Sequence, residues 1–306
     1  MNKTAFIFPG QGSQYPGMGK ELADSFPVAR RTFEEADDAI ATKLSAICFG
    51  GSEDELKLTA NTQPAILTTS IAILRVIEQE TGLKAAYLAG HSLGEYSALV
   101  CSGALDFADA VRTVRARGTF MQEAVPVGVG AMAAMLSIDK EVLEAICNEA
   151  AQGEVVSPAN FNSPGQIVIA GHSTAVNRAI EIAKGKGFRK AMLLPVSAPF
   201  HCELMKPAAD KLAAVVAALA YSPMTAPVVS NVDAEPNQES ARVNGFLVAQ
   251  VCRPVLWEQS IQKMASLGVE KFVEIGPGKV LSGLVKRITK EVATANVEDL
   301  TGLKAL

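Results

Sequence analysis

Apolar residues recur along the chain in two spacings, one typical of buried strands and one typical of amphipathic helices. Short continuous apolar runs predict strands, at residues 3–8, 85–90, 228–231 and 271–275. Segments whose apolar residues recur every three or four positions predict helices, at residues 21–42, 64–80, 106–121, 202–220, 243–251 and 258–267. Because strands and helices alternate, we expect a mostly parallel sheet covered by helices.

The middle of the chain follows a different order of elements. Strands are expected at residues 131–138, 154–161, 166–170 and 188–196, with helices at 140–151 and 174–184. This strand-helix-strand-strand-helix-strand order is that of the ferredoxin-like βαββαβ unit, a compact module. We therefore predict an α/β-hydrolase-like large domain, residues 1–126 and 197–306, into which a ferredoxin-like small domain, residues 127–196, is inserted. Pro126 and Pro195 lie near the boundaries.

The sequence Gly90-His91-Ser92-Leu93-Gly94 separates a predicted strand from a predicted helix. This G-x-S-x-G pattern is typical of a nucleophile elbow, in which glycines allow close backbone contacts and a strained turn exposes the serine. The start of the next helix would favour negative charge that develops near Ser92. Two interpretations are open from this motif: a nucleophilic serine, or a serine that only begins a helix.

A serine nucleophile needs a base to take its proton, and the chain has three histidines. His91 adjoins Ser92 on a tight turn, where neighbouring side chains diverge. His172 follows a strand of the predicted small domain, where it would cap a helix or face solvent. His201 lies where the chain re-enters the large domain, a loop position typical of catalytic residues. His201 is therefore the candidate base, with a packing role as the alternative.

No carboxylate stands out as the third member of a catalytic triad. The chain order of hydrolase motifs would allow Asp106, Asp109, Glu123 or Asp139, all of which lie in or near predicted helices. We expect a Ser-His dyad instead, in which a backbone carbonyl holds the imidazole tautomer.

Three arginines on the helix at 106–121 point in different directions. At about 100° per residue, Arg112 lies opposite the apolar centre of the helix and Arg115 well to its side, so both are expected to be solvated. Arg117 lies within roughly 60° of that centre. An inward guanidinium needs an anionic partner, because an unpaired buried charge costs several kcal/mol. That partner would be a substrate anion or an internal Asp or Glu.

Composition narrows the class of function. The 306 residues include 28 Lys and Arg against 32 Asp and Glu, a net charge of −4 that does not favour nucleic-acid binding. Charged residues interrupt every apolar run before the ~18 residues that a bilayer span needs. The N-terminal apolar run is too short for a signal peptide. We therefore expect a soluble cytoplasmic protein that contacts no membrane.

Two further kinds of site are not expected. The five cysteines are scattered without a C-x-x-C pair, which favours neither a disulfide nor a metal site. The glycine-rich residues 9–19 do not match the phosphate-binding G-x-x-x-x-G-K-[ST] pattern, but such a loop can bring backbone N–H groups close to a ligand.

Several ordered motifs meet in this chain. They are Gly10-Gln11-Gly12-Ser13-Gln14, the elbow, Arg117, Ser197-Ala198-Pro199-Phe200-His201, Gln250 and Gly276-Pro277-Gly278. Over essentially its whole length the chain resembles the malonyl-CoA:acyl carrier protein transacylases. The combination is far more specific than any single motif, and it favours a nucleophilic Ser92 and a substrate contact for Arg117.

The resemblance implies an acyltransferase that moves the malonyl group from malonyl-CoA to the phosphopantetheine thiol of acyl carrier protein. The transfer would be ping-pong, and it would supply extender units for fatty acid or polyketide synthesis. Ser92 would attack the thioester while His201, oriented by the backbone carbonyl of Gln250, takes its proton. The backbone N–H groups of Gln11 and Leu93 would form the oxyanion hole.

The resemblance also assigns the substrate contacts. Arg117 would clamp the malonyl carboxylate through two parallel hydrogen bonds, and Gln11, Gln250 and Phe200 would line the substrate site. Leu93 and Phe200 match the malonyl-preferring pattern of the family, in which bulk near the α-carbon disfavours methylmalonyl. No metal or cofactor is implied.

Carrier proteins of this family are acidic, so the resemblance implies a basic surface near the site. Candidates are Lys184, Lys186, Arg189 and Lys190, or Lys286 and Arg287. We expect a monomer. Two alternatives are a hydrolase that uses the same serine and histidine, and a catalytically silent module that docks a carrier protein.

Overall fold

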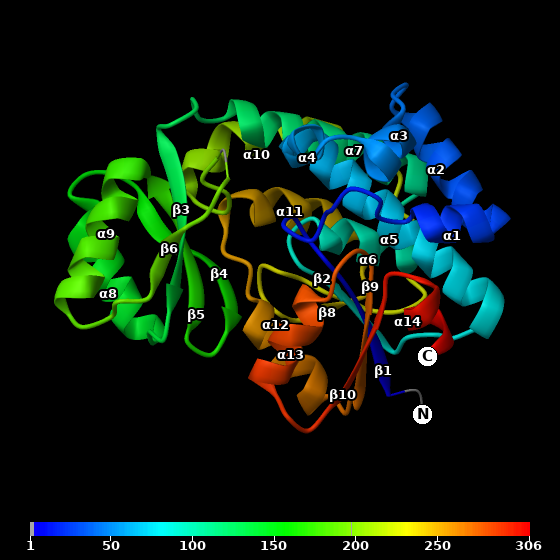
Figure 1. Ribbon diagram of the computed structural model, residues 1–306. Helices are drawn as coiled ribbons and strands as arrows, with labels where there is room; N and C mark the ends of the chain where they lie inside the picture. The colour runs from blue at the N-terminus through cyan, green and yellow to red at the C-terminus, as the bar shows by residue number, and fades with distance from the viewer. Residues whose placement is uncertain (1–2, 197) are drawn as a thin grey trace.

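The computed structural model describes residues 3–196 and 198–306, which form two β-sheets that lie side by side (Figure 1). The larger sheet has the strand order β10-β9-β1-β2-β7-β8, and every neighbouring pair is parallel except β7 with β8. Its strands are β1 (Thr4–Phe8), β2 (Tyr87–Gly90), β7 (Val228–Val229), β8 (Pro236–Asn237), β9 (Lys271–Ile275) and β10 (Ala293–Val297). The expected mostly parallel sheet is confirmed.

Helices cover both faces of the large sheet, which explains why its strands are continuous apolar runs. Successive side chains of β1 point to opposite faces, so Phe6 and Phe8 enter one core while Ala5 and Ile7 enter the other. The first core is closed by α2 (Pro27–Ala39), α5 (Thr59–Thr81), α6 (Gly94–Cys101), α7 (Phe107–Glu123), α10 (Lys206–Ala217) and α11 (Ser240–Cys252). The second core is closed by α12 (Trp257–Ser266) and α13 (Val280–Ile288).

The remaining helices of this unit are short. They are α1 (Lys20–Ser25), α3 (Leu44–Gly50), α4 (Glu53–Lys57), the 3-10 turn η1 (Glu203–Met205) and α14 (Leu300–Lys304). Of these, α1, α3, α4 and α14 can be followed in Figure 1. None of the helices in the described part of the chain combines the length and the apolar character that a membrane span requires.

The smaller sheet is antiparallel and has the order β4-β5-β3-β6. Its elements follow one another as β3 (Gly130–Leu136), α8 (Lys140–Ala151), β4 (Val156–Ser163), β5 (Gln166–His172), α9 (Ser173–Gly185) and β6 (Ala191–Leu193). The predicted ferredoxin-like βαββαβ order is therefore confirmed. Backbone hydrogen bonds from Val255 to Ala159 and from Phe161 to Val255 join this sheet to the large unit.

The boundaries between the two units stay a prediction, and Ser197, at the second boundary, lies outside the described residues. The last strand of the small sheet is shorter than the expected 188–196, because only Ala191–Leu193 pairs with β3. Met192 and Leu193 are exposed on this edge strand.

Other expected element boundaries were wrong for identifiable reasons. The single helix expected at 21–42 is two helices, because Pro27 lacks a backbone N–H and begins a new helix at its first position. The helix expected at 64–80 begins at Thr59, so Pro64 lies inside it. The helix expected at 202–220 is η1 followed by α10. The apolar spacing did not predict β10, which is a partly exposed edge strand, or the helix α14.

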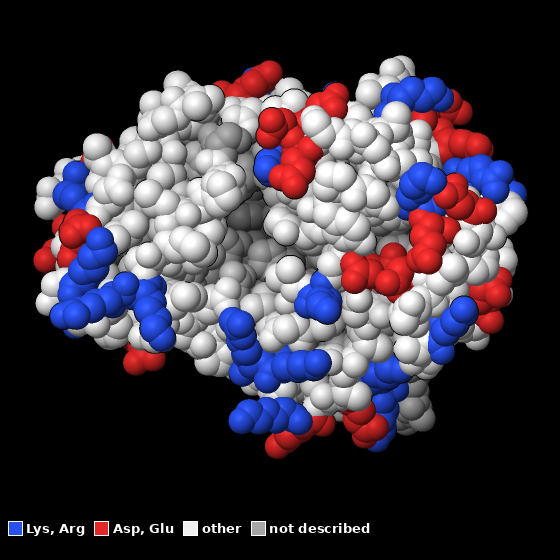
Figure 2. Space-filling model, in the orientation of Figure 1, with Lys and Arg blue, Asp and Glu red and all other residues white. Residues whose placement is uncertain are grey.

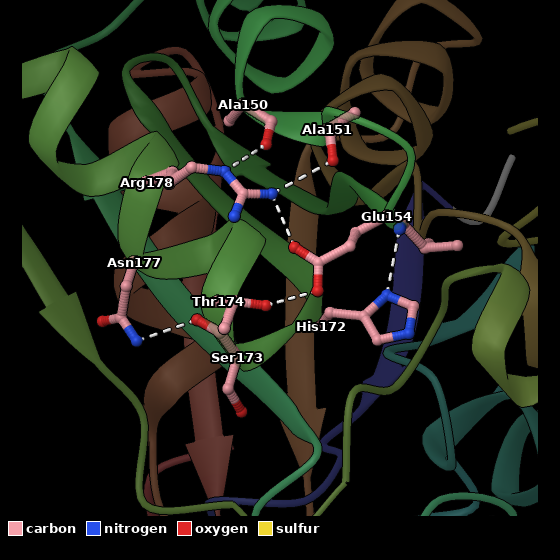
Figure 3. Close-up of polar contacts among 9 residues, drawn as sticks. Ala150, Ala151, Glu154, His172, Ser173, Thr174, Asn177 and Arg178 are labelled. Carbon is pink, nitrogen blue, oxygen red and sulfur yellow. Dashed lines mark hydrogen bonds and ion pairs between the residues drawn. The ribbon is translucent and has the colours of Figure 1, made fainter.

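A polar cluster ties the two helices of the small unit together at one end (Figure 3). Arg178 on α9 donates to the backbone carbonyls of Ala150 and Ala151, at the end of α8, over 2.9 and 3.1 Å. The same guanidinium pairs with Glu154, which also accepts a hydrogen bond from Thr174. Carbonyls that the end of α8 leaves unpaired thereby gain a charged donor.

Gly118 sets the distance between α7 and α5, and it gives a test of this packing. A β-carbon at Gly118 would lie 2.6 Å from the backbone oxygen of Thr59, so we predict that Gly118→Ala lowers the free energy of unfolding by about 1–3 kcal/mol. Urea denaturation followed by circular dichroism measures this change.

Gly245 on α11 is the matched control. Apart from its chain neighbours and the backbone of its own helix, no described heavy atom would lie within 4 Å of its β-carbon, so Gly245→Ala should leave stability unchanged or raise it by up to about 1 kcal/mol. Equal unfolding midpoints for wild type and Gly118→Ala would contradict the close contact.

Candidate active site

Ser92 stands at the turn between β2 and α6, in a backbone conformation that few non-glycine residues adopt. Its φ angle is 50°, and such strain is typical of functional turns. The glycines on either side are required by close approach: a β-carbon on Gly90 would lie 1.9 Å from the carbonyl carbon of Gly94, and one on Gly94 would lie 2.1 Å from the backbone oxygen of Phe8. The five-residue motif therefore adopts the geometry of an elbow.

His201 contacts the serine hydroxyl. The distance from Ser92 Oγ to His201 Nε2 is 2.7 Å, and His201 Nδ1 lies 2.8 Å from the backbone oxygen of Gln250. A carbonyl oxygen only accepts hydrogen bonds, so Nδ1 carries the proton and Nε2 is free to accept the hydroxyl proton. His201 is itself held at a φ angle of 61°. The structure thus brings together the two residues that were expected to form a dyad.

The surroundings of His201 favour its neutral form. Its side chain is almost fully buried. Burial, together with the positive charge of Arg117, lowers the pKa of His201 from 6.5 to about 3. The imidazole is therefore unprotonated at neutral pH, as a general base must be.

Arg117 reaches the same point from α7, and its side chain is only 1% exposed. Its Nη2 lies 3.1 Å from Ser92 Oγ and 2.8 Å from Gln250 Oε1, while Nη1 lies 2.8 Å from Gln63 Oε1. Its Nε–H has no hydrogen-bond partner in the described part of the chain. Its hydrogen-bond partners are uncharged, and no Asp or Glu among residues 3–196 and 198–306 forms an ion pair with the guanidinium.

The other arginines of α7 differ from one another. Arg112 pairs with Asp109 on the surface, in agreement with its expected position. Arg115 was expected to be solvated, but it donates to the backbone oxygen of Ala60 over 2.9 Å and to the side chain of Asn61. The expectation was wrong because the start of α5 packs against this side of α7 and offers acceptors there.

The glycine-rich loop after β1 packs on the elbow. A β-carbon on Gly10 would lie 2.4 Å from the backbone oxygen of His91, so only glycine permits this approach. The loop after β9 supports it, since a β-carbon on Gly276 would lie 2.6 Å from Cγ of Pro9. Both Gln11 and Leu93 border the cleft at Ser92. Their backbone N–H groups make no hydrogen bond within residues 3–196 and 198–306, which leaves two donors beside the serine.

A cleft of about 110 Å³ contains these groups and opens between the two units (Figure 2). Leu194, Val196 and Met132 border it from the small unit. Phe200 lines it next to His201, and Phe200 and Leu93 are both buried. A second hollow, of about 160 Å³, lies beyond Gln11 and His91 and reaches residues of α13.

The remaining histidines do not contact the hydroxyl. His91 Nε2 lies 2.8 Å from Asn162 Oδ1, and its ring packs on Trp257. His172 is the N-cap residue of α9, as expected, but its side chain makes no capping hydrogen bond; its Nδ1 instead accepts the backbone N–H of Val155 over 3.0 Å (Figure 3).

The four carboxylates considered as a third member lie elsewhere. Asp106 caps α7, Asp109 pairs with Arg112, Glu123 pairs with Lys211, and Asp139 precedes α8. The far nitrogen of His201 instead contacts a backbone oxygen, the arrangement expected for a dyad.

Sequence patterns missed the polar residues that surround the dyad. Asn231, which follows β7, accepts the backbone N–H of Ser92 over 2.7 Å and donates to the backbone oxygen of Gly90 over 2.7 Å. Gln63 on α5 holds Arg117. Glu95 on α6 is buried beside Gln250. The one available signal was that Glu95 is a single acid within an otherwise uncharged helix.

Fold and site together define an α/β enzyme with a Ser-His pair at an elbow and a buried arginine beside it, which is the class of acyl-transferring enzymes. The chain matches the family model "Acyl transferase domain" over residues 5–305. It belongs to the family of malonyl CoA-acyl carrier protein transacylases.

Two relatives illustrate the similarity in sequence. The malonyl CoA-acyl carrier protein transacylase of Escherichia coli (strain K12) is 51% identical over 305 residues, covering 100% of this chain and 99% of the relative. That of Bacillus subtilis (strain 168) is 53% identical over 300 residues, covering 98% and 94%.

Two solved structures illustrate the similarity in fold. An acyl carrier protein S-malonyltransferase from Vibrio cholerae has a TM-score of 0.97 at 48% identity, over 99% of both chains. A malonyl-transacylase in complex with a type II polyketide synthase acyl-carrier protein also has a TM-score of 0.97 at 48% identity, over 99% of this chain and 98% of that one.

The environment of His201 predicts its titration. We expect the imidazole to stay neutral, with its proton on Nδ1, at pH values where an unfolded histidine with a pKa near 6.5 is protonated. Because the unfolded state then binds more protons, this group makes the free energy of unfolding decrease as pH falls from about 6.5 toward 3. Nitrogen-15 NMR of the imidazole groups measures the first effect, with the protein in concentrated urea as the control. A His201 signal that titrates near pH 6.5 in the folded protein would contradict the assignment.

Proposed function

We propose that this protein transfers the malonyl group from malonyl-CoA to the phosphopantetheine thiol of an acyl carrier protein. The observation that carries the proposal is the buried Arg117 guanidinium, 3.1 Å from the Ser92 hydroxyl and held only by uncharged acceptors. A cation placed in this way is suited to an acyl group that carries its own carboxylate. The relatives are named for this reaction.

In the first half of the reaction, Ser92 attacks the thioester carbonyl of malonyl-CoA. His201 Nε2 takes the hydroxyl proton, and the Gln250 carbonyl stabilises the resulting imidazolium through Nδ1–H. The backbone N–H groups of Gln11 and Leu93 receive the negative charge on the tetrahedral oxygen. Coenzyme A leaves as the thiol after it takes the proton from His201, and a malonyl-serine ester remains.

In the second half, the carrier's thiol gives its proton to His201 and attacks the ester. The same two N–H groups stabilise the second tetrahedral oxygen, and the proton returns to Ser92 as its bond to the acyl carbon breaks. Acyl donor and acceptor therefore use one site in turn, which is a ping-pong reaction.

Arg117 provides selectivity for a carboxylate. An acetyl group would leave the buried guanidinium without an anionic partner, whereas malonyl supplies two hydrogen-bond acceptors in parallel. Phe200 and Leu93 border the space around the acyl α-carbon and disfavour a methylmalonyl group. One methyl group is worth only about 1–3 kcal/mol, so this second preference is the weaker one.

The acceptor approaches from the side where the second hollow opens. Arg287 donates to Gln166 Oε1 over 2.6 Å, and Gln166 lines that hollow. Figure 2 shows basic side chains along the lower side of the molecule, below the central hollow. This positively charged surface is suited to binding an acidic carrier protein. The carrier belongs to fatty acid or polyketide synthesis.

The protein acts as a monomer in the cytoplasm. A monomer is sufficient, because every group assigned to the reaction comes from one chain. A cytoplasmic location fits the five cysteines, which are free, as is usual in a reducing compartment. Light scattering of the purified protein tests the oligomeric state.

The acyl-enzyme distinguishes the proposal from its alternatives. Intact-mass measurement after incubation with malonyl-CoA should show a mass increase of one malonyl group, which Ser92→Ala removes. Addition of carrier protein should discharge the ester to the carrier thiol. Continued release of coenzyme A without carrier, beyond one equivalent per enzyme molecule, would indicate a hydrolase, and no mass increase in the wild type would indicate a docking module.

Arg117→Ala tests whether this arginine recognises the malonyl carboxylate or is needed for the transfer of any acyl group. We expect kcat/KM with malonyl-CoA to fall by about 100-fold or more, because two charge-assisted hydrogen bonds are lost, while use of acetyl-CoA relative to malonyl-CoA improves. Arg112→Ala, on the exposed side of the same helix, is the matched control and should keep both activities. An unchanged preference for malonyl-CoA in Arg117→Ala would place the carboxylate elsewhere.

A further inference from the structure

Glu95 is a buried carboxylate next to the dyad that the transfer reaction itself does not use. It lies in the first turn of α6 and is 3% exposed. Its Oε2 accepts hydrogen bonds from Gln250 Nε2 over 2.8 Å and from the backbone N–H of Asn231 over 3.1 Å. A carboxylate is costly to bury, so its place beside the nucleophile calls for a reason beyond packing.

The first contact of Glu95 determines the orientation of the Gln250 amide. Gln250 Nε2 donates to Glu95 and, over 3.1 Å, to the backbone oxygen of Ser92, while Gln250 Oε1 accepts from Arg117. Rotating the amide by half a turn would place its NH₂ against the guanidinium and its oxygen against the carboxylate. Only one orientation satisfies all three neighbours.

The second contact of Glu95 links it, through Asn231, to the backbone turn that holds Ser92. The Asn231 backbone is held by Glu95, and the Asn231 side chain accepts the backbone N–H of Ser92 and donates to Gly90. Glu95 is thus one hydrogen-bonded residue away from both the serine turn and the arginine.

We propose that Glu95 is a positioning residue: through Gln250 its carboxylate holds Arg117 in the orientation that receives the carboxylate of the acyl group. The inference rests on the proposed function of Ser92 and Arg117. It adds a residue that touches no substrate but that sets the direction of the buried cation.

The charged and titratable groups that face Glu95 come from several elements. They are Arg117 on α7, Tyr96 on α6 and Asp233 after β7. Burial raises the pKa of Glu95 to about 7, against the opposing effects of Gln250, Asn231 and Arg117. Malonyl transfer should therefore fall as pH decreases through about 7, because a protonated Glu95 holds the Gln250 amide less firmly. His201 titrates at a much lower pH and does not account for such a limb.

Glu95→Gln tests the proposal, because it keeps the shape of the side chain and removes the charge. We expect kcat/KM with malonyl-CoA to fall by on the order of 100-fold, as when a reacting group is misplaced by about 1 Å. The limb near pH 7 should disappear from its pH profile. Glu274→Gln is the matched control: Glu274 is also buried and accepts two backbone N–H groups, from Leu281 and Ser282, at the start of α13. It should keep both the activity of the folded protein and the pH profile.

A double-mutant cycle shows whether Glu95 acts through Gln250. Gln250→Ala removes the amide but keeps the backbone oxygen that contacts His201. In that background Glu95→Gln should cause little further loss, since the contact through which it acts is already gone. The same further loss in both backgrounds would overturn the proposal, as would unchanged kinetics and pH profile in Glu95→Gln.

Glu95→Asp keeps the inference testable if Glu95→Gln does not fold. The shorter carboxylate keeps the charge, so the pH limb should remain while kcat/KM falls; unchanged kcat/KM would overturn the proposal. If the wild type itself forms no malonyl-enzyme, the proposed function fails, and the inference fails with it. That outcome is distinguishable because every variant and the wild type then behave alike.

Discussion

The site depends on one buried positive charge whose hydrogen-bond partners among the described residues are all uncharged. Arg117 is almost fully removed from water, and its nearest partners are two amide oxygens and a hydroxyl. Such a charge is costly, and neutral acceptors only partly offset that cost. The polar residues around it, Gln63, Gln250 and indirectly Glu95, make this arrangement tolerable in the absence of an acyl group. The elbow and the base are arranged around the same point.

The parallel sheet is what allows these groups to converge. The carboxyl ends of parallel strands lie at one edge, so the loops after β1, β2, β7 and β9 meet there. They contribute Gln11, Ser92, Asn231 and the glycine turn that begins at Gly276. Glycines at Gly10 and Gly276 allow two of these loops to approach their neighbours more closely than any other residue would permit. The small antiparallel sheet then closes one side of the cleft.

Both residues that exchange a proton are held in a strained backbone conformation. Ser92 and His201 both have positive φ angles, and each is held there by contacts from other elements. Asn231 and Gln250 bind the backbone around Ser92, while the Gln250 backbone oxygen orients His201. A serine hydroxyl and an imidazole held in this way lose little freedom when an acyl group arrives, which favours reaction over mere binding.

The sequence alone determined the alternation of strands and helices, the βαββαβ order of the small unit and the candidates Ser92, His201 and Arg117. Each of these is a local property, since apolar spacing reports burial and the elbow is five consecutive residues. Only the tertiary structure decided what surrounds those candidates. The acceptors for Arg117 come from α5 and α11, and Asn231 meets Ser92 from beyond β7. Hydrogen bonds between residues far apart in the chain leave no periodic pattern, because each depends on two elements packing at a particular distance. For the same reason, the helical spacing could mark Arg117 as inward-facing but could not by itself choose between an internal acid and a substrate anion; only the resemblance to a family favoured the anion.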